Sequence, residues 1–275
     1  MLPRIRHPGI VACVLVLLAL AGIAFFADQL SPYNPEKADL AHRLEAPGPA
    51  HLFGTDHMGR DILSRVIYGT RISLAIGLIV VIISAAIGGA VGLVSGYFGG
   101  LVDDAIMRVV DAFLAFPGTM LALGIAGLFG AGFFNLLVAL VVVEWSPFAR
   151  LVRGTVISIR ERDFIKASVG LGEGDVRVML RHVLPNAVSP LLVMATTGIG
   201  GVILTAAGLS FLGLGVQPPT PEWGYMLNDG KLFIRTAPYI MIFPGLMILV
   251  TVIAFNYLGD GLRDMLDPRS RIERL

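Results

Sequence analysis

Long apolar stretches alternate with short polar segments along the whole chain. Each stretch has about 20 residues, the length that a helix needs to cross a hydrocarbon core about 30 Å thick. The pattern predicts six membrane-spanning helices, at residues 10–27, 72–95, 106–129, 134–152, 188–212 and 239–258. We therefore expect an all-α polytopic membrane protein with a single transmembrane domain over residues 1–275.

The composition supports membrane insertion. Hydrophobic residues make up 55% of the chain, charged residues only 15%, and the mean hydropathy is +0.79. A soluble domain carries about 25% charged residues, so this chain has too little polar surface to stay dissolved as a globule. Its net charge of +1 provides no basic field for nucleic acid. The single cysteine, Cys13, excludes a disulfide framework and a cysteine-based zinc site.

The positions of basic residues predict the orientation. With the N-terminus inside, 14 of the 21 Lys and Arg residues fall in cytoplasmic segments, as the positive-inside rule requires. Arg4 and Arg6 precede the first apolar stretch, as in a signal peptide. No cleavage site of small residues follows it, so we expect a retained anchor. Both termini are expected in the cytoplasm.

Four segments then lie outside the membrane: an external loop (28–71), a cytoplasmic loop (153–187), a second external loop (213–238) and a cytoplasmic tail (259–275). The first external loop ends in an apolar helical face, on which Asp61 and Arg65 are expected to pair. The same loop holds four residues that could ligate a metal: His51, Asp56, His57 and Met58. Such residues are common in surface loops, so we predict no metal site.

The cytoplasmic loop has the most informative pattern. Phe164, Ala167, Ser168 and Leu171 have helical spacing, and the glycines that follow predict a helix stop. A second apolar helical pattern covers residues 176–183, and Pro185 is expected to end it. The pattern predicts two short helices joined by a glycine turn. Two apolar faces are more than a solvated connector requires, which favours a docking surface for a soluble partner.

Four sequence stretches resemble one transporter family. Residues 165–172 (IKASVGLG), followed after nine residues by 182–185 (HVLP), are similar to the EAA loop of ATP-binding-cassette importer permeases. Residues 53–65, 209–224 and 258–269 resemble the C-type permease subunit of the dipeptide, oligopeptide and nickel importers. Together the four stretches cover both external loops, the cytoplasmic loop and the tail.

The resemblance implies the transmembrane domain of a type I importer in the bacterial cytoplasmic membrane. Such a permease pairs with a homologous B-type permease, binds two ATPase domains inside, and receives substrate from an external binding protein. The EAA loop then supplies a coupling helix that fits a groove on the ATPase. Lys166 replaces the family's glutamate, which leaves the local charge pairing with the ATPase open. The implied coupling residues are Asp163, Phe164, Lys166, Ala167, Ser168, Leu171, Gly172, Glu173, Leu184 and Pro185.

The chain lacks its own ATPase motif. The only Gly-Lys pair, at 230–231, is followed by leucine, so no phosphate-binding loop is present. We expect no cofactor on this chain, with ATP and magnesium bound by the partner ATPases. Two other classes are weaker readings. An intramembrane aspartyl protease could use Asp111 and Asp260, but the Gly-x-Gly-Asp motif is missing and Arg108 is an ordinary partner for Asp111. A passive channel would not need a docking loop.

Two features of the predicted spans remain. Glu144 lies within a span, where a carboxylate costs about 2.5–3.5 kcal/mol on insertion scales. It lines a pathway, pairs with a neighbouring helix or lies at a frayed end near Pro147. Gly88, Gly92 and Gly96 recur every four residues and predict close contact with another helix. The family resemblance favours dipeptides or oligopeptides as substrates, with nickel, haem and glutathione as alternatives.

Overall fold

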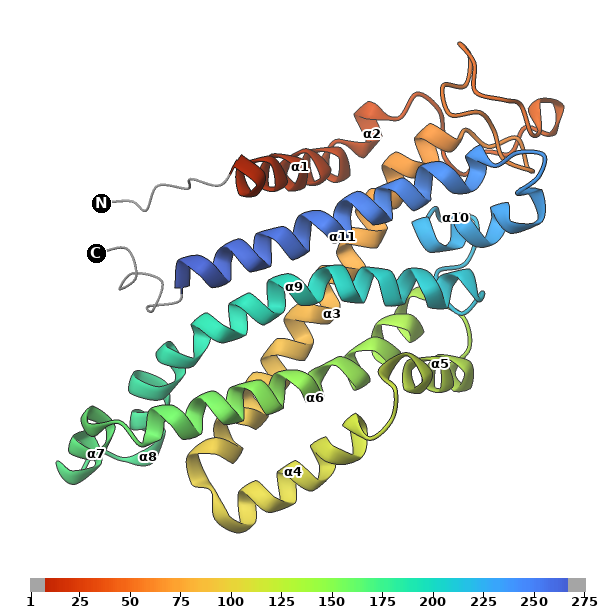
Figure 1. Ribbon diagram of the computed structural model, residues 1–275. Helices are drawn as coiled ribbons and strands as arrows, with labels where there is room; N and C mark the ends of the chain where they lie inside the picture. The colour runs from red at the N-terminus through yellow and green to blue at the C-terminus, as the bar shows by residue number, and fades with distance from the viewer. Residues whose placement is uncertain (1–7, 267–275) are drawn as a thin grey trace.

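The computed structural model describes residues 8–266 as a bundle of helices (Figure 1). Within this range there is no strand, only one β-bridge between Thr55 and Asp61. The terminal arginines used to predict the orientation lie outside the described residues. In chain order, the elements are α1 (Pro8–Phe25), α2 (Ala27–Leu30), η1 (Leu40–His42), α3 (Ile62–Phe98), α4 (Gly100–Leu114), α5 (Gly118–Phe129), α6 (Phe133–Arg160), α7 (Asp163–Gly170), α8 (Asp175–Val178), η2 (Met179–Val183), α9 (Leu184–Phe211), α10 (Trp223–Gly230), η3 (Lys231–Phe233) and α11 (Tyr239–Leu266).

Four helices of the described region are long and apolar enough to cross a membrane. They are α3, α6, α11 and the continuous helix Asp175–Phe211, which joins α8, η2 and α9. The pair α4 and α5 adds a fifth if both form one crossing, and α1 contains a shorter apolar helix over Gly9–Phe25. The all-α membrane fold is therefore confirmed, whereas the count of six crossings stays a prediction.

The third apolar stretch, residues 106–129, does not form one continuous helix. α4 ends at Leu114, α5 begins at Gly118, and the two helices are bent by 84° relative to each other. Pro117 explains the break, because it has no amide hydrogen to donate and its ring disfavours helical backbone at Phe116. Figure 1 shows α4 and α5 as two separate arms beside α6. The structure thus corrects the expectation of a continuous span here.

The second crossing begins ten residues earlier than the sequence predicts. α3 starts at Ile62 because the Asp61 carboxylate accepts a hydrogen bond of 2.7 Å from the Ser64 amide and caps the helix. The apolar face at the end of the first external loop therefore continues directly into the membrane helix. The expected ion pair between Asp61 and Arg65 is wrong: Arg65 instead lies 3.5 Å from the Asp56 carboxylate.

Pro185 does not end the second helix of the cytoplasmic loop, contrary to the sequence prediction. The helix runs from Asp175 through Pro185 to Phe211. Just before the proline, η2 is a π-helical turn in which the Leu184 amide bonds to the Met179 carbonyl, five residues back. This wider turn accommodates the proline ring, and Pro185 has no amide hydrogen that needs a partner. The cytoplasmic loop is therefore joined rigidly to a membrane helix.

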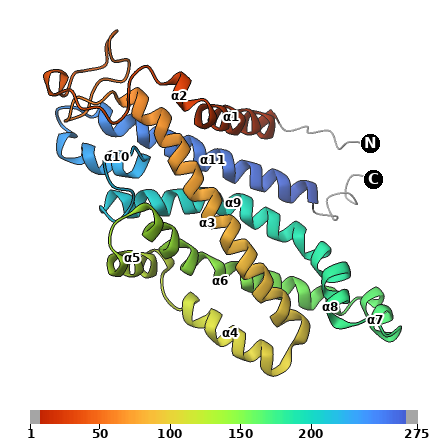
Figure 2. The same ribbon diagram turned by 180° about the vertical axis from the view of Figure 1, so that it is seen from behind.

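The long helix α3 crosses one side of the bundle, in the foreground of Figure 2, and lies against α6. Gly88, Gly92 and Gly96 form the contact. A Cβ atom at Gly92 would lie 2.4 Å from the Ala149 carbonyl oxygen, and one at Gly88 would lie 2.3 Å from the Trp145 carbonyl oxygen. Only glycine allows backbones to approach this closely. The helix that these glycines meet is α6 of the same chain.

A compact cap, formed by the loop before α3 and by α10, covers the end of the bundle opposite α7 (Figure 1). Its centre is Trp223, which is fully buried and donates a hydrogen bond of 3.1 Å from Nε1 to the Val66 carbonyl of α3. Glu222 caps α10 by accepting hydrogen bonds from the Gly224 and Tyr225 amides, both 2.8 Å. Burial raises the pKa of Glu222 above its ordinary value. These contacts hold α10 against the halves of α3 and α9 that lie away from α7.

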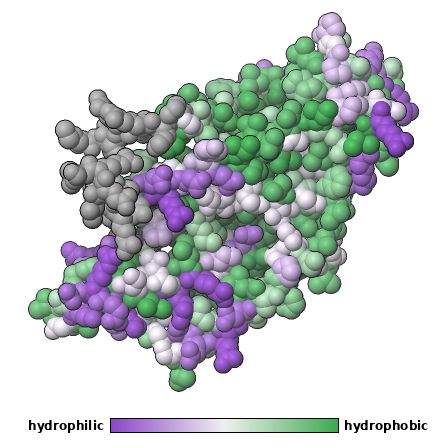
Figure 3. Space-filling view, viewed as in Figure 1, coloured by the Kyte–Doolittle hydropathy of each residue, from purple (hydrophilic) through white to green (hydrophobic). Residues whose placement is uncertain are grey.

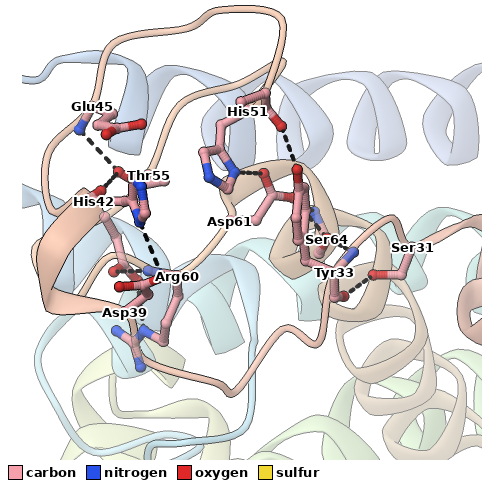
Figure 4. A network of polar contacts seen from close by, with 12 residues as sticks. Ser31, Tyr33, Asp39, His42, Glu45, His51, Thr55, Arg60, Asp61 and Ser64 are labelled. Carbon is pink, nitrogen blue, oxygen red and sulfur yellow. Dashed lines mark hydrogen bonds and ion pairs between the residues drawn. The ribbon is translucent and has the colours of Figure 1, made fainter.

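Side-chain hydrogen bonds order the first external loop, which has little regular structure (Figure 4). His51 contacts the Asp61 carboxylate at 2.9 Å, and Asp61 also accepts the Ser64 hydroxyl at 2.7 Å. Thr55 Oγ1 donates to the His42 carbonyl and accepts from the Glu45 amide. The loop is thereby fixed onto the first turn of α3.

The surface matches a membrane location. Figure 3 shows hydrophobic side chains over the middle of the bundle, with hydrophilic ones mainly at its two ends. One end carries the first external loop and α10. The opposite end carries α7, the start of α1 and the end of α11 (Figure 1). Ile10 of α1 lies at Gly261 of α11, where an added Cβ would be 2.7 Å from the Ile10 Cδ1 atom. The two described ends of the chain therefore lie together, on the side of α7.

Candidate functional site

α7 is a short helix at one end of the bundle, held by a single buried side chain. Ile165 is 1% exposed and packs in an apolar cluster that includes Ile159, Val178 and Val183. The other faces of α7 point outward, so Phe164 is 44% exposed and Ala167 is also exposed. The sequence pattern predicts the helix but not the role of Ile165, whose apolar side chain lies outside the predicted stripe. α7 is thus fixed from behind and presents a free outer surface.

The glycine turn after α7 has the geometry of a Schellman motif. The Glu173 amide bonds to the Ser168 carbonyl at 3.3 Å, and the Gly172 amide bonds to the Val169 carbonyl at 2.9 Å. Gly172 has φ = +83°, the left-handed conformation that this position requires. The expected left-handed glycine is present, and it determines where the chain turns back towards α8.

Side chains close the same turn. Glu173 accepts a hydrogen bond from the Ser168 hydroxyl and lies 3.0 Å from His182 Nε2. The Ser168 hydrogen bond, assisted by His182, lowers the pKa of Glu173 below its ordinary value. The sequence pattern does not predict this contact of His182, which lies nine residues after Glu173, because the contact depends on how the glycine turn folds back. The contact ties the end of α7 to η2 and so to the membrane helix α9.

The remaining candidate coupling residues lie around this unit. Lys166 forms an ion pair of 3.1 Å with Glu161 at the end of α6, and both side chains are exposed. Asp163 is in the first turn of α7. Leu184 and Pro185 open α9, where Leu184 packs on the buried cluster and Pro185 is exposed. The fold therefore gathers all ten residues at one end of the molecule.

An apolar surface surrounds the turn. Leu171 is 89% exposed, Val176 65% and Leu180 55%. Val176 and Leu180 line an open groove of about 810 Å³ together with Arg177 and Arg181. Exposed leucines and valines beside arginines are typical of a protein docking surface. We name the outer face of α7, its turn and this groove the α7 surface.

Asp111 and Glu144, acidic residues of the predicted spans and candidates for pathway lining or helix packing, lie outside the α7 surface, in α4 and α6. Asp111 of α4 pairs with Arg150 of α6, so the expected pairing with Arg108 is corrected: Arg150 reaches across from the neighbouring helix. Both side chains of this pair are more than half exposed. Glu144 is partly buried in α6, and it has no hydrogen bond or ion pair with any described residue.

The external cap contains one group of side chains with the spacing of a metal site. The ligand atoms of Asp56, His57 and Asp229 lie within 4.8 Å of one another. Arg60, however, contacts the Asp56 carboxylate at 2.7 Å and the Asp229 carboxylate at 2.9 Å, and buried Arg65 lies beside both. Two guanidinium groups already balance the two carboxylates. The group is therefore an ion-pair network between the first external loop and α10. His51, another candidate ligand, is bound to Asp61.

The bundle, the continuous loop-to-membrane helix and the α7 surface define a transmembrane subunit of a type I ATP-binding-cassette importer. The chain belongs to the binding-protein-dependent transport system inner membrane component family, whose model matches residues 88–272. Residues 5–47 also match the N-terminal transmembrane domain of oligopeptide transport permease C.

Similar proteins agree with this assignment. The chain is 46% identical over 265 residues to the glutathione transport system permease protein GsiD of Pectobacterium atrosepticum, covering 96% of this chain and 88% of that protein. It is 43% identical over 258 residues to the dipeptide transport system permease protein DppC of Alkalihalophilus pseudofirmus, covering 94% and 85%. A solved structure of the MetNI methionine ABC transporter in an inward-facing conformation has a TM-score of 0.62 at 19% identity. The matched region covers 75% of this chain and 98% of the matched transporter chain, and this likeness shows the fold alone.

The family also fixes the general role of the chain. It is a membrane-embedded, multi-pass transport subunit of the inner membrane and not an enzyme, and ATP is hydrolysed by partner ATPases. An importer of this kind works with a partner permease and a substrate-binding protein.

Proposed function

We propose that this chain is the C-type permease subunit of an importer for short peptides, including dipeptides and glutathione. It forms half of the translocation pathway, and a homologous B-type permease forms the other half. Two ATPase domains bind inside, and a substrate-binding protein delivers peptide outside. ATP and magnesium bind to the ATPases, and this chain holds no cofactor.

The α7 surface is the observation that carries the proposal. A coupling element must be rigid, because movement of the ATPase has to reach the membrane helices without being lost in a flexible loop. Ile165 and the Glu173–His182 contact supply this rigidity, and the unbroken helix from Asp175 to Phe211 leads from the surface into the membrane. In this proposal Ala167 and Ser168 are the small residues that seat α7 in the ATPase groove.

The arrangement of the chain supports cytoplasmic termini. The start of α1 and the end of α11 lie on the side of α7, opposite the first external loop (Figure 1). If the ATPases bind α7, then both described ends of the chain face the cytoplasm. The excess of arginine in the same segments gives the same orientation.

The substrate class follows from the relatives. Permeases named for glutathione and for dipeptides are both more than 40% identical to this chain over nearly its full length. Both substrates are short peptides with a free amino group. Nickel and haem gain no support from the external cap, because its carboxylates are paired with arginines.

Uptake by the reconstituted importer tests the proposed function. The complete complex is placed in proteoliposomes, and labelled alanyl-alanine and glutathione are supplied separately with the binding protein. ATP-dependent accumulation of at least one peptide is expected, with complexes lacking ATP as the control. If neither peptide accumulates while the ATPases remain active, this chain is not a peptide permease.

A further inference from the structure

Glu144 is an ionisable side chain with no hydrogen-bond or ion-pair partner among residues 8–266. It is the twelfth of the 28 residues of α6, well inside a helix that is apolar enough to cross the membrane. The nearby Arg150 pairs with Asp111, and no described residue bonds to Glu144. Carboxylates inside membrane helices are costly and face a partner or a wet cavity. Since residues 8–266 supply no partner for Glu144, a ligand or a partner subunit is the group to consider.

The face of α6 that carries Glu144 leads into a polar groove. At 3.6 residues per turn, Leu151, Thr155 and Ser158 follow Glu144 on one side of the helix. All three line a groove of about 550 Å³ between α6 and the first turns of α9. Asn186 of α9 adds an amide to the same groove, and Arg150 and Arg162 add two guanidinium groups. Glu144 is thus followed along α6 by a polar groove whose cations are Arg150 and Arg162, and Glu144 is the carboxylate nearest the middle of this helix.

We propose that Glu144 accepts the protonated amino group of the peptide in the translocation pathway. The inference rests on the proposed function, because dipeptides and glutathione share this group. A carboxylate and an ammonium form a charge-assisted hydrogen bond, which is stronger than a hydrogen bond between two neutral groups. The pair also removes the isolated charge that Glu144 otherwise leaves in the membrane. A peptide without its amino group lacks this contact.

A comparison of two substrates in two importers isolates this contact. Wild-type and E144Q complexes are reconstituted with the same binding protein, saturated with alanyl-alanine or with propionyl-alanine, which lacks only the amino group. Any preference of the binding protein is the same in both complexes. The change in the ratio of the two uptake rates between wild type and E144Q therefore reports on the permease. E144D keeps the charge, and D104N removes an exposed carboxylate of α4 as the matched control.

The expected result is specific to the amino group. In the wild type, uptake of alanyl-alanine exceeds that of propionyl-alanine, and E144Q lowers this ratio by about tenfold or more, the effect of losing one charged hydrogen bond. E144D retains most of the preference, D104N retains all of it, and partner subunits co-purify with each variant.

Three outcomes separate the possibilities. An unchanged ratio in E144Q overturns the proposal. Loss of co-purification in E144Q but not in E144D also overturns it, because Glu144 would then bind a basic residue of the partner permease. Absence of uptake of either peptide by the wild type contradicts the proposed function itself.

Discussion

Gly92 shows how much a single missing side chain contributes to this fold. An added Cβ would lie 2.4 Å from the Ala149 carbonyl oxygen and 2.9 Å from the Arg153 amide nitrogen, both backbone atoms of α6. Backbone atoms cannot rotate away as a side chain can, so the helices would have to separate. Gly124 of α5 has no atom within 4 Å of an added Cβ and offers a matched comparison.

We predict that Gly92→Leu destabilises the folded chain by about 3 kcal/mol or more, at the upper end of the usual cost of overpacking. The unfolding temperature measures the effect: the purified complex is heated in detergent, and the folded fraction that remains is determined by size-exclusion chromatography. Gly124→Leu should unfold close to the wild-type temperature. Equal unfolding temperatures for Gly92→Leu and the wild type would show that α3 and α6 do not pack through this glycine.

At the scale of elements, apolar length and glycine spacing predicted the helices, whereas two prolines were misread. Pro117 lies inside a long apolar stretch, and hydropathy alone does not register its missing amide. Pro185 has the opposite effect, because a π-helical turn before it lets the helix continue. Pro147, Pro190 and Pro244 also lie inside continuous helices, so whether a proline breaks a helix depends on the local backbone and packing, which the sequence pattern does not reveal.

In the candidate site, too, local features were predictable from the sequence and contacts between separate elements were not. Short-range spacing predicted α7 and its left-handed glycine, since both depend on neighbouring residues. The partners of Asp111 and Glu173 were missed because they depend on how separate elements pack. Arg150 is 39 residues from Asp111, and His182 lies beyond a turn whose path is set by Gly172.

At the scale of the whole molecule, the opposite positions of the α7 surface and the first external loop define an orientation. We predict that Ala46→Cys reacts with a membrane-impermeant thiol reagent added outside the cell, because Ala46 is exposed in the external loop. Glu161→Cys, exposed beside α7, should react only after the membrane is opened. Both variants carry Cys13→Ser to remove the native thiol. The reverse labelling pattern would place the α7 surface outside and contradict the proposed orientation.

The central claim is that the α7 surface transmits ATPase movement to the membrane helices. Ala167 is exposed on α7, and a tryptophan there would hold an ATPase groove away without disturbing the buried Ile165. The most direct measurement is the ATPase activity of the reconstituted importer, stimulated by peptide-loaded binding protein, with the amount of co-purified ATPase. We predict that Ala167→Trp lowers the stimulated activity by about tenfold or more, equivalent to about 1.4 kcal/mol of lost coupling. Ala41→Trp on the external side should stay near the wild-type level, and stimulation and co-purification at wild-type levels in Ala167→Trp would contradict the account.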